Sequence, residues 1–194
     1  MRALLLLLPI TLLTGCGTFA DPTTWLGEAD VVEPSDLVEL QNVIQPDTVW
    51  KADSGAGTDE QWLALQPHVE DDTVFVVDGK GRVQAFAIAD GNRRWRIDLD
   101  APVAGGPGVG EGLVLLGTSD AEVIALAMES GEERWRARVS SEVLSVPATA
   151  EGVVIVHTVD GKLFGLEAAT GSERWRYERE VPVLTLRGNG SPVI

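Results

Sequence analysis

Two histidines and one cysteine are the side chains of this 194-residue sequence with the widest range of chemistry. His68 and His157 lie in or beside different predicted strands, and no carboxylate is spaced to pair with either one. The sequence contains no Ser/His/Asp order typical of a hydrolase and no cluster of metal-ligand residues. The glycine-rich stretch 105–112 leads into a predicted strand rather than a helix, so it does not predict a phosphate-binding loop. We therefore expect no catalytic residue, no metal site and no cofactor.

The only cysteine, Cys16, ends a typical export segment. The sequence opens with "MRALLLLLPITLLTGC", in which Arg2 precedes an apolar run that is too short to cross a bilayer. Leu13-Thr14-Gly15-Cys16 resembles a bacterial lipobox, so we expect residues 1–15 to be a signal peptide and Cys16 to carry lipid. The alternative is an ordinary secretory signal in which the cysteine occurs by chance. Gly17 follows, rather than the aspartate that resembles an inner-membrane retention signal, which favours the periplasmic face of the outer membrane.

Residues 16–46 are acidic and interrupted by Pro22, Pro34 and Pro46, which predicts a tether between the lipid and a folded domain. The formal net charge of −15 argues against nucleic acid, whose phosphates select basic proteins. The negative charge is interpreted as keeping the protein soluble; the alternative is that its field selects a basic partner.

The domain itself, predicted over 47–194, shows an internal repeat of about forty residues. Each unit ends in Gly, three further residues and Trp, at Gly91 and Trp95, Gly131 and Trp135, and Gly171 and Trp175. Short apolar runs and turn residues divide each unit into four antiparallel strands, the pattern of a β-propeller blade. We expect an all-β fold, with blades at about 60–100, 101–140 and 141–180 and the first strand of a fourth at 181–194.

The repeated tryptophans are predicted to be structural. Side chains alternate across a strand, so the indole points to one face and the flanking arginines to the other. A large apolar ring on an outer strand can seal one blade against the next, and the charges protect the edge from unwanted pairing. Stacking on a cofactor is the less favoured alternative.

The repeat is broken at one junction. Trp95 and Trp135 are each followed by proline after twelve residues, whereas Trp175 is followed by Pro192 after seventeen. The longer connection carries Leu184, Leu186 and Arg187, residue types that anchor protein interfaces. We expect these three to bind a partner; the alternative is that the leucines pack into the next blade. The equally long connection from 50 to 67 is glycine-rich and acidic, and we predict a plain loop there.

These features together resemble two known groups of proteins. The blades are similar to those of quinoprotein-type (PQQ-like) propellers. The lipobox, the acidic tether, "TVWKADSG" before the first blade and "VLTLRG" after the third resemble the BamB family, lipoprotein scaffolds of the outer-membrane β-barrel assembly complex.

The resemblance to BamB implies a non-catalytic protein without a small-molecule substrate. It also implies that the loop with Leu184, Leu186 and Arg187 contacts the periplasmic domains of a BamA-like barrel protein. Propellers of this family have about eight blades, so the sequence predicts an incomplete propeller, a fragment or truncated product. The alternatives are a fragment of a PQQ-dependent quinoprotein dehydrogenase and a periplasmic propeller that binds another client.

Overall fold

The structure is a computed structural model that describes residues 35–36, 44, 46–58, 60–178 and 190–193. The chain divides into two units, Met1–Pro46 and Asp47–Ile194. The predicted signal peptide, Cys16 and most of the tether lie outside the described residues. Within the described part of the chain, no helix is long and apolar enough to cross a membrane.

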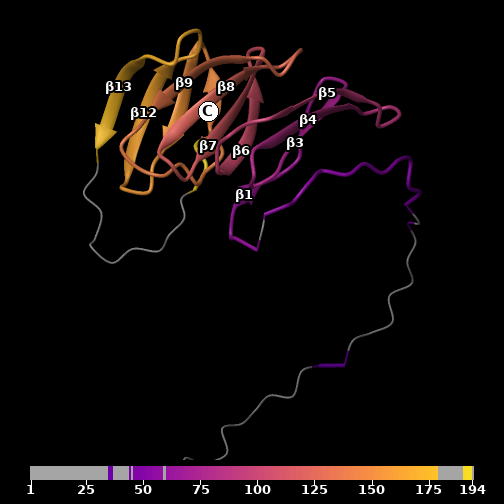
Figure 1. The fold of residues 1–194 in the computed structure, drawn as a ribbon. Coiled ribbons are helices and arrows are strands. Elements are labelled where there is room, and N and C mark those ends of the chain that lie inside the picture. Colours follow the sequence, from indigo (N-terminus) through magenta and orange to yellow (C-terminus); the bar gives the residue numbers. More distant parts are fainter. Residues whose placement is uncertain (1–34, 37–43, 45, 59, 179–189, 194) are drawn as a thin grey trace, which may run out of the picture. The chain divides into compact units, whose positions relative to one another are not determined.

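The second unit consists of three sheets built from consecutive segments of the chain (Figure 1). The first sheet contains β2 (His68–Glu70), β3 (Thr73–Val77), β4 (Arg82–Ala87) and β5 (Arg93–Asp98). The second contains β6 (Val103–Gly110), β7 (Leu113–Thr118), β8 (Glu122–Ala127) and β9 (Glu133–Arg138), with β1 (Ala64–Leu65) added beside β6. The third contains β10 (Ala148–Ala150), β11 (Val153–His157), β12 (Lys162–Glu167) and β13 (Glu173–Glu178).

Consecutive strands within each sheet pair antiparallel, in order from the inner to the outer strand. The all-β prediction of four-stranded propeller blades is therefore confirmed. The outer strands β5, β9 and β13 carry the arginine–tryptophan motifs. The arginines of these strands are exposed, and charged side chains on an edge strand discourage its pairing with another chain.

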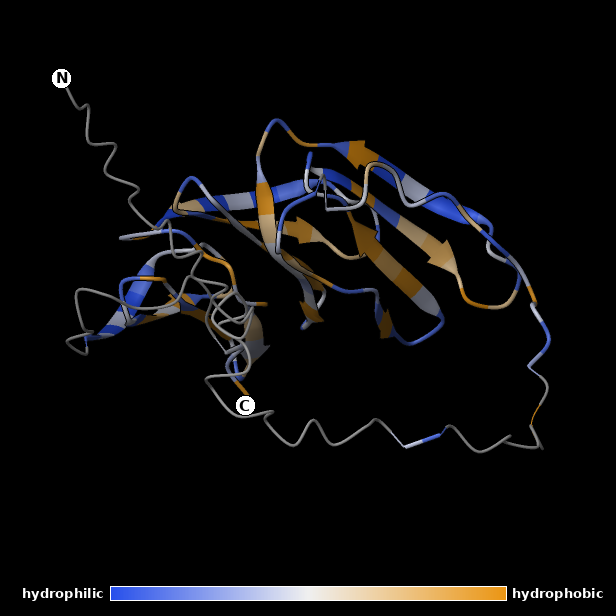
Figure 2. Ribbon diagram, turned by 90° about the horizontal axis from the view of Figure 1, so that it is seen from below, coloured by the Kyte–Doolittle hydropathy of each residue, from blue (hydrophilic) through white to orange (hydrophobic). Residues whose placement is uncertain are grey.

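The hydrophobic cores lie between neighbouring sheets. One cluster joins Phe75 and Val83 of the first sheet to Leu116 and Ile124 of the second. A second cluster joins the opposite face of the second sheet to the third, and it includes Trp135. Figure 2 shows hydrophobic residues gathered in the strands and hydrophilic residues in many of the turns. The second sheet is therefore covered on both faces.

The repeated tryptophans join each sheet to the next. The Trp95 indole N–H donates to the Met128 carbonyl oxygen at 3.0 Å, and its ring lies against Gly131. The Trp135 indole donates to the Ala168 carbonyl oxygen at 2.7 Å, and its ring lies against Gly171. A Cβ atom on either glycine would come within 2.7 Å of the ring, so only glycine leaves room for the indole. We call each site formed by a glycine and the carbonyl three residues before it a tryptophan slot.

The prediction of a plain loop between residues 50 and 67 is wrong. Residues Ala64 and Leu65 form β1, which pairs in parallel with Gly105 and Gly106 of β6. Trp50 fills the slot at Gly91, and its indole donates to the Ile88 carbonyl oxygen at 2.8 Å. Residues 50–67 bind the sheets mainly through backbone groups, which any residue carries. For that reason the composition of this segment does not reveal that it is ordered.

Candidate interaction site

The predicted partner-binding residues Leu184, Leu186 and Arg187 lie outside the described residues, but both flanks of their segment are described. Before it, Glu178 ends β13 and pairs with Lys162 at the start of β12. After it, the Gly190 carbonyl oxygen lies 3.2 Å from Nδ1 of His157, the last residue of β11. Both flanks therefore lie at the end of the third sheet that carries the β11–β12 turn. We call this end of the sheets, with the β3–β4, β7–β8 and β11–β12 turns, the connection end.

The turns at the connection end are held by buried side chains at equivalent positions. Asp78 and Thr118 accept hydrogen bonds from the backbone N–H groups of Arg82 and Glu122, at 2.9 and 3.0 Å. Thr158 occupies the same place in the third sheet and donates to the Lys162 carbonyl oxygen at 3.1 Å. The connection end is thus a set of rigid turns, each braced from inside its own sheet.

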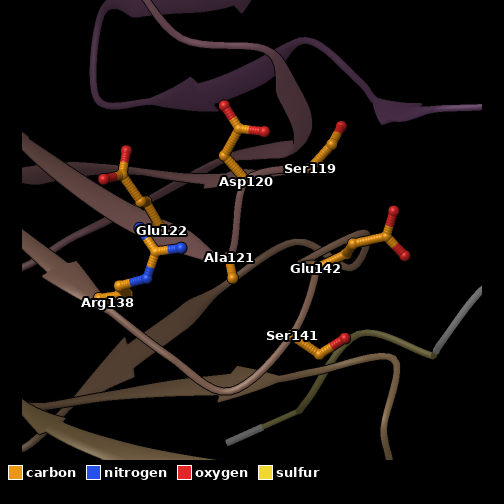
Figure 3. A pocket seen from close by; sticks show the side chains of 7 residues that line it. All are labelled: Ser119, Asp120, Ala121, Glu122, Arg138, Ser141 and Glu142. Atoms are coloured by element: carbon orange, nitrogen blue, oxygen red, sulfur yellow. The ribbon is translucent and has the colours of Figure 1, made fainter.

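An open polar hollow of about 560 Å³ lies at the connection end of the second sheet. Its lining comes from the β7–β8 turn and from the segment after β9, and Figure 3 shows Asp120 and Glu142 projecting from these two segments. Arg138 and Glu122 line the hollow as well. Ser119 and Ser141 are its hydroxyl groups, but no histidine lines it. The hollow therefore presents hydroxyl, carboxylate and guanidinium groups at the connection end.

Ion pairs fix several side chains near this end. Arg136 donates to Glu122 at 2.8 Å and to Glu133 at 3.1 Å, and these two carboxylates raise the pKa of Arg136, Glu133 contributing more. In the third sheet, burial alone would raise the pKa of Asp160. Hydrogen bonds from Thr158 and Lys162 outweigh it and leave the pKa of that carboxyl below its ordinary value. Both groups are therefore charged at neutral pH.

Trp62 is a feature of the connection end that sequence analysis missed. Its side chain is 99% exposed. Exposing so large an apolar ring to water costs free energy, and exposed tryptophans are typical of interaction surfaces. The neighbouring residues are anchored at the β3–β4 turn, where the Gly79 N–H donates to the Gly57 carbonyl oxygen at 2.8 Å. The sequence alone does not separate Trp62 from Trp50, because both fall outside the forty-residue register of Trp95, Trp135 and Trp175.

The structure does not bring the two histidines together. His68 lies on β2, with Nε2 3.9 Å from Glu70, so the expectation that no carboxylate pairs with it is wrong. His157 lies on β11 of the third sheet. Across the described residues, no group of three His, Cys, Asp or Glu side chains could hold a metal ion.

Comparison with known proteins assigns the family. A sequence profile described as "Outer membrane protein assembly factor BamB" matches residues 45–101 and 79–194. The chain belongs to the BamB family. The BamB protein of Pseudomonas aeruginosa is 60% identical over 161 residues, which are 83% of this chain. The BamB protein of Salmonella typhimurium is 36% identical over 134 residues, or 63% of this chain.

Solved structures agree with this assignment. The crystal structure of BamB from Moraxella catarrhalis matches with a TM-score of 0.63 and 26% identity, over 66% of this chain and 39% of that one. The quinohemoprotein alcohol dehydrogenase of Comamonas testosteroni matches with a TM-score of 0.52 and 24% identity, over 60% of this chain and 21% of that one. The second likeness shows a shared propeller fold alone. The chain spans 33% to 42% of the length of the Salmonella and Pseudomonas BamB proteins.

Proposed function

We propose that this chain is a non-catalytic scaffold lipoprotein in the assembly of outer-membrane β-barrel proteins. The observation that carries the proposal is the 60% identity to an outer membrane protein assembly factor over 83% of the chain. At that level of identity we expect the two chains to share the sheets over the matched residues. Because the chain spans 42% of that relative, the proposal concerns the part of the function that these sheets carry.

The proposed partner is a BamA-like barrel protein, bound through its periplasmic domains by Leu184, Leu186 and Arg187. Two features support this proposal. The connection that carries these residues is five residues longer than the two before it. It also begins and ends at the connection end, which presents the exposed Trp62 and the polar hollow. Apolar anchors surrounded by polar groups are the usual anatomy of a protein interface.

The test is capture of the purified periplasmic domains of such a barrel protein. The variant Leu184→Ala, Leu186→Ala, Arg187→Ala is expected to weaken binding at least thirtyfold, since loss of such anchors commonly costs about 2 kcal/mol or more. Arg134→Ala is a matched control, because Arg134 is exposed near the start of β9, at the opposite end of that strand from the connection end. Its affinity should not change.

Circular dichroism separates the proposal from its alternative. Under the proposal, the triple variant keeps the β-sheet spectrum and the melting temperature of the natural chain while it loses binding. If binding and the β-sheet signal fall together, the leucines belong to the core. Unchanged capture by a folded triple variant would refute the interface.

The non-catalytic part of the proposal has its own test. We expect the purified chain to retain no pyrroloquinoline quinone after incubation with the quinone and Ca²⁺, and to reduce no dye with alcohols or aldose sugars. The readout is the quinone absorbance that remains on the protein after gel filtration. Retention of one quinone per chain would contradict the scaffold assignment and favour the dehydrogenase alternative.

A further inference from the structure

The connection after β13, residues 179–191, differs from the connection after β9 in length and in composition. We call it the long connection, because it is five residues longer between the tryptophan and the proline. Four residues before that proline it has Gly188, where the earlier connection has Val143. The sheet has changed in the opposite sense, since His157 at the end of β11 stands where β7 has Gly117. A large side chain has thus moved from the connection to the strand.

At the earlier junction the connection lies directly on the end of the strand. The Val143 N–H donates to the Thr118 carbonyl oxygen at 2.9 Å. A Cβ atom on Gly117 would lie 2.7 Å from the Val143 carbonyl oxygen, so the strand has no room for a side chain at this point. Val143 is itself fully buried in the core between the second and third sheets. Backbone bonds and apolar packing therefore fix this connection.

At the third sheet a polar side chain takes over this role. The His157 side chain is half-buried, and its Nδ1 lies 3.2 Å from the Gly190 carbonyl oxygen. A carbonyl oxygen only accepts hydrogen bonds, so this contact requires the ring proton on Nδ1. The His157 carbonyl oxygen accepts from the buried Ser145 hydroxyl at 3.2 Å, which holds the backbone that carries the ring. The imidazole thus joins the strand end to the chain that returns from the long connection.

Ser191 holds the returning chain at a second point. Its hydroxyl oxygen accepts from the Val146 N–H at 3.1 Å. The first junction has a similar bond, in which the Gln66 N–H donates to the Gly106 carbonyl oxygen at 3.2 Å. In both cases the donor precedes the proline of one unit and the acceptor residue precedes the proline of the next. The place of Ser191 therefore follows the repeat, but a side chain supplies the oxygen that the backbone supplies at Gly106.

We propose that His157 and Ser191 are positioning residues for the long connection, and that they set the affinity of this chain for its partner. They act through the connection rather than by contact with the partner. This inference rests on the proposed function, in which the long connection binds a BamA-like barrel protein through Leu184, Leu186 and Arg187.

The physical reason is the short distance along the chain between the positioning residues and the binding residues. His157 holds Gly190, which is the third residue after Arg187, and Ser191 follows next. A binding loop loses conformational freedom when its partner binds, and this loss weakens the affinity. Two hydrogen bonds so close to the binding residues restrict the long connection beforehand, so that less freedom is lost in the complex.

The test compares full-chain variants in their binding to the purified periplasmic domains of a BamA-like barrel protein. His157→Leu removes the donor at a similar volume and should weaken binding about threefold to tenfold, the range for the loss of one hydrogen bond. His157→Asn should bind like the natural chain, because the asparagine side-chain N–H group, like Nδ1, is on an atom bonded to Cγ. Ser191→Ala should weaken binding to a similar extent, whereas Ser191→Thr keeps the hydroxyl and should not.

Two measurements separate positioning from a general structural role. His68→Leu is the matched control, because His68 is the other histidine and lies on β2 of the first sheet, and its affinity should not change. We expect the melting temperature of every variant to equal that of the natural chain, since these bonds hold a connection rather than the core. A melting temperature that falls in both His157→Leu and Ser191→Ala, together with the affinity, would contradict positioning.

Two further readouts do not depend on the partner. Trypsin can cleave after Arg187, and slow cleavage of a folded protein follows the population of its open conformations. We expect this cleavage, followed by mass spectrometry, to be about threefold to tenfold faster in His157→Leu and Ser191→Ala and unchanged in His157→Asn. Nitrogen NMR of the histidine rings should show neutral His157 with its proton on Nδ1.

The outcomes distinguish this inference from the proposed function. Equal cleavage after Arg187 in the natural chain, His157→Leu and Ser191→Ala would overturn the inference, as would a neutral His157 with its proton on Nε2. Natural affinity in these two variants, with binding lost in the triple variant of Leu184, Leu186 and Arg187, would overturn the inference alone. If the triple variant binds like the natural chain, the proposed function fails, and the claim that His157 and Ser191 set the affinity fails with it.

Discussion

At the scale of single residues, the glycines after the third strands serve two purposes at once. Gly91, Gly131 and Gly171 have φ values of 72°, 76° and 72°, a region that costs other residues about 1–2 kcal/mol. Each also supports the indole of a tryptophan from the preceding segment. The forty-residue spacing of glycine and tryptophan therefore records one physical contact, made by Trp95 and Trp135, and Trp50 makes the same contact from outside that spacing.

The two purposes can be separated by substitution. Gly131→Ala is expected to lower the free energy of unfolding by about 2–4 kcal/mol, from the left-handed φ and from overpacking against Trp95. Gly112→Ala is the matched control, because Gly112 also has a φ of 76° but a Cβ there would meet nothing within 4 Å. It should cost only the conformational part, about 1–2 kcal/mol. Urea unfolding at neutral pH measures both, and equal losses would show that the slot contributes nothing.

At the scale of elements, the joints between sheets use polar contacts as well as tryptophans. Glu111, in the turn between β6 and β7, accepts hydrogen bonds from the Thr149 hydroxyl at 2.6 Å and the Gly152 N–H at 2.9 Å. Thr149 belongs to β10, so the carboxylate links the second sheet to the third. The Thr149 hydroxyl and then the Gly152 N–H hold the pKa of Glu111 below its ordinary value of 4.5.

This joint predicts a pH dependence. A carboxyl with a lowered pKa in the folded protein stabilises the fold above its unfolded pKa, and that stabilisation is lost as the pH falls through the folded pKa. Glu111→Gln should therefore be less stable than the natural chain at pH 7, with the difference shrinking once the pH falls below about 4.5. Urea unfolding of both proteins between pH 7 and pH 3 tests this. The two proteins must be compared at each pH, because the pKa values of Asp72, Asp98 and Asp160 are lowered too and make the stability of both proteins depend on pH. A difference independent of pH would contradict the assignment.

At the scale of the whole molecule, the sheets form an array in which one joint is repeated. The slots of the first, second and third sheets receive Trp50, Trp95 and Trp135 in turn. Each joint lies between neighbours, so stability is expected to accumulate along the array as in other repeat proteins. We expect surfaces for other molecules where these joints leave side chains exposed, as at the connection end with Trp62.

We propose that attachment of the protein to the membrane depends on one residue, Cys16. We expect Cys16→Ala to move the protein from the membrane fraction to the soluble periplasmic fraction, because each buried CH₂ of an acyl chain contributes about 0.8 kcal/mol to anchoring. Cells fed labelled palmitate should label the natural chain and not the variant. Cys16 is the only cysteine, so no other thiol can take the label. Labelling of both proteins to the same extent would refute lipidation at this position.

The sequence by itself determined the blades. Alternating apolar strands, turn glycines and a tryptophan every forty residues are local signals, and each unit repeats them without a gap. For that reason the β3–β4, β7–β8 and β11–β12 hairpins and the outer arginine–tryptophan strands could all be predicted. The role of Leu184, Leu186 and Arg187 stays a prediction from the length of their connection.

Only the tertiary structure decided which contacts are made by residues outside the repeated units. Trp50 lies 45 residues before Trp95, so it falls out of register, yet it fills the slot at Gly91. Residues 50–57 and β1 bind largely through backbone N–H and carbonyl groups, which carry no residue-type signal. In the sequence Gln84 and Asp78 look like ordinary polar residues, and only the structure shows that they bind the backbone of Asp53 and Ala56. Periodicity reports the contacts that a chain repeats, whereas a contact made once is visible only when the partners are seen together in space.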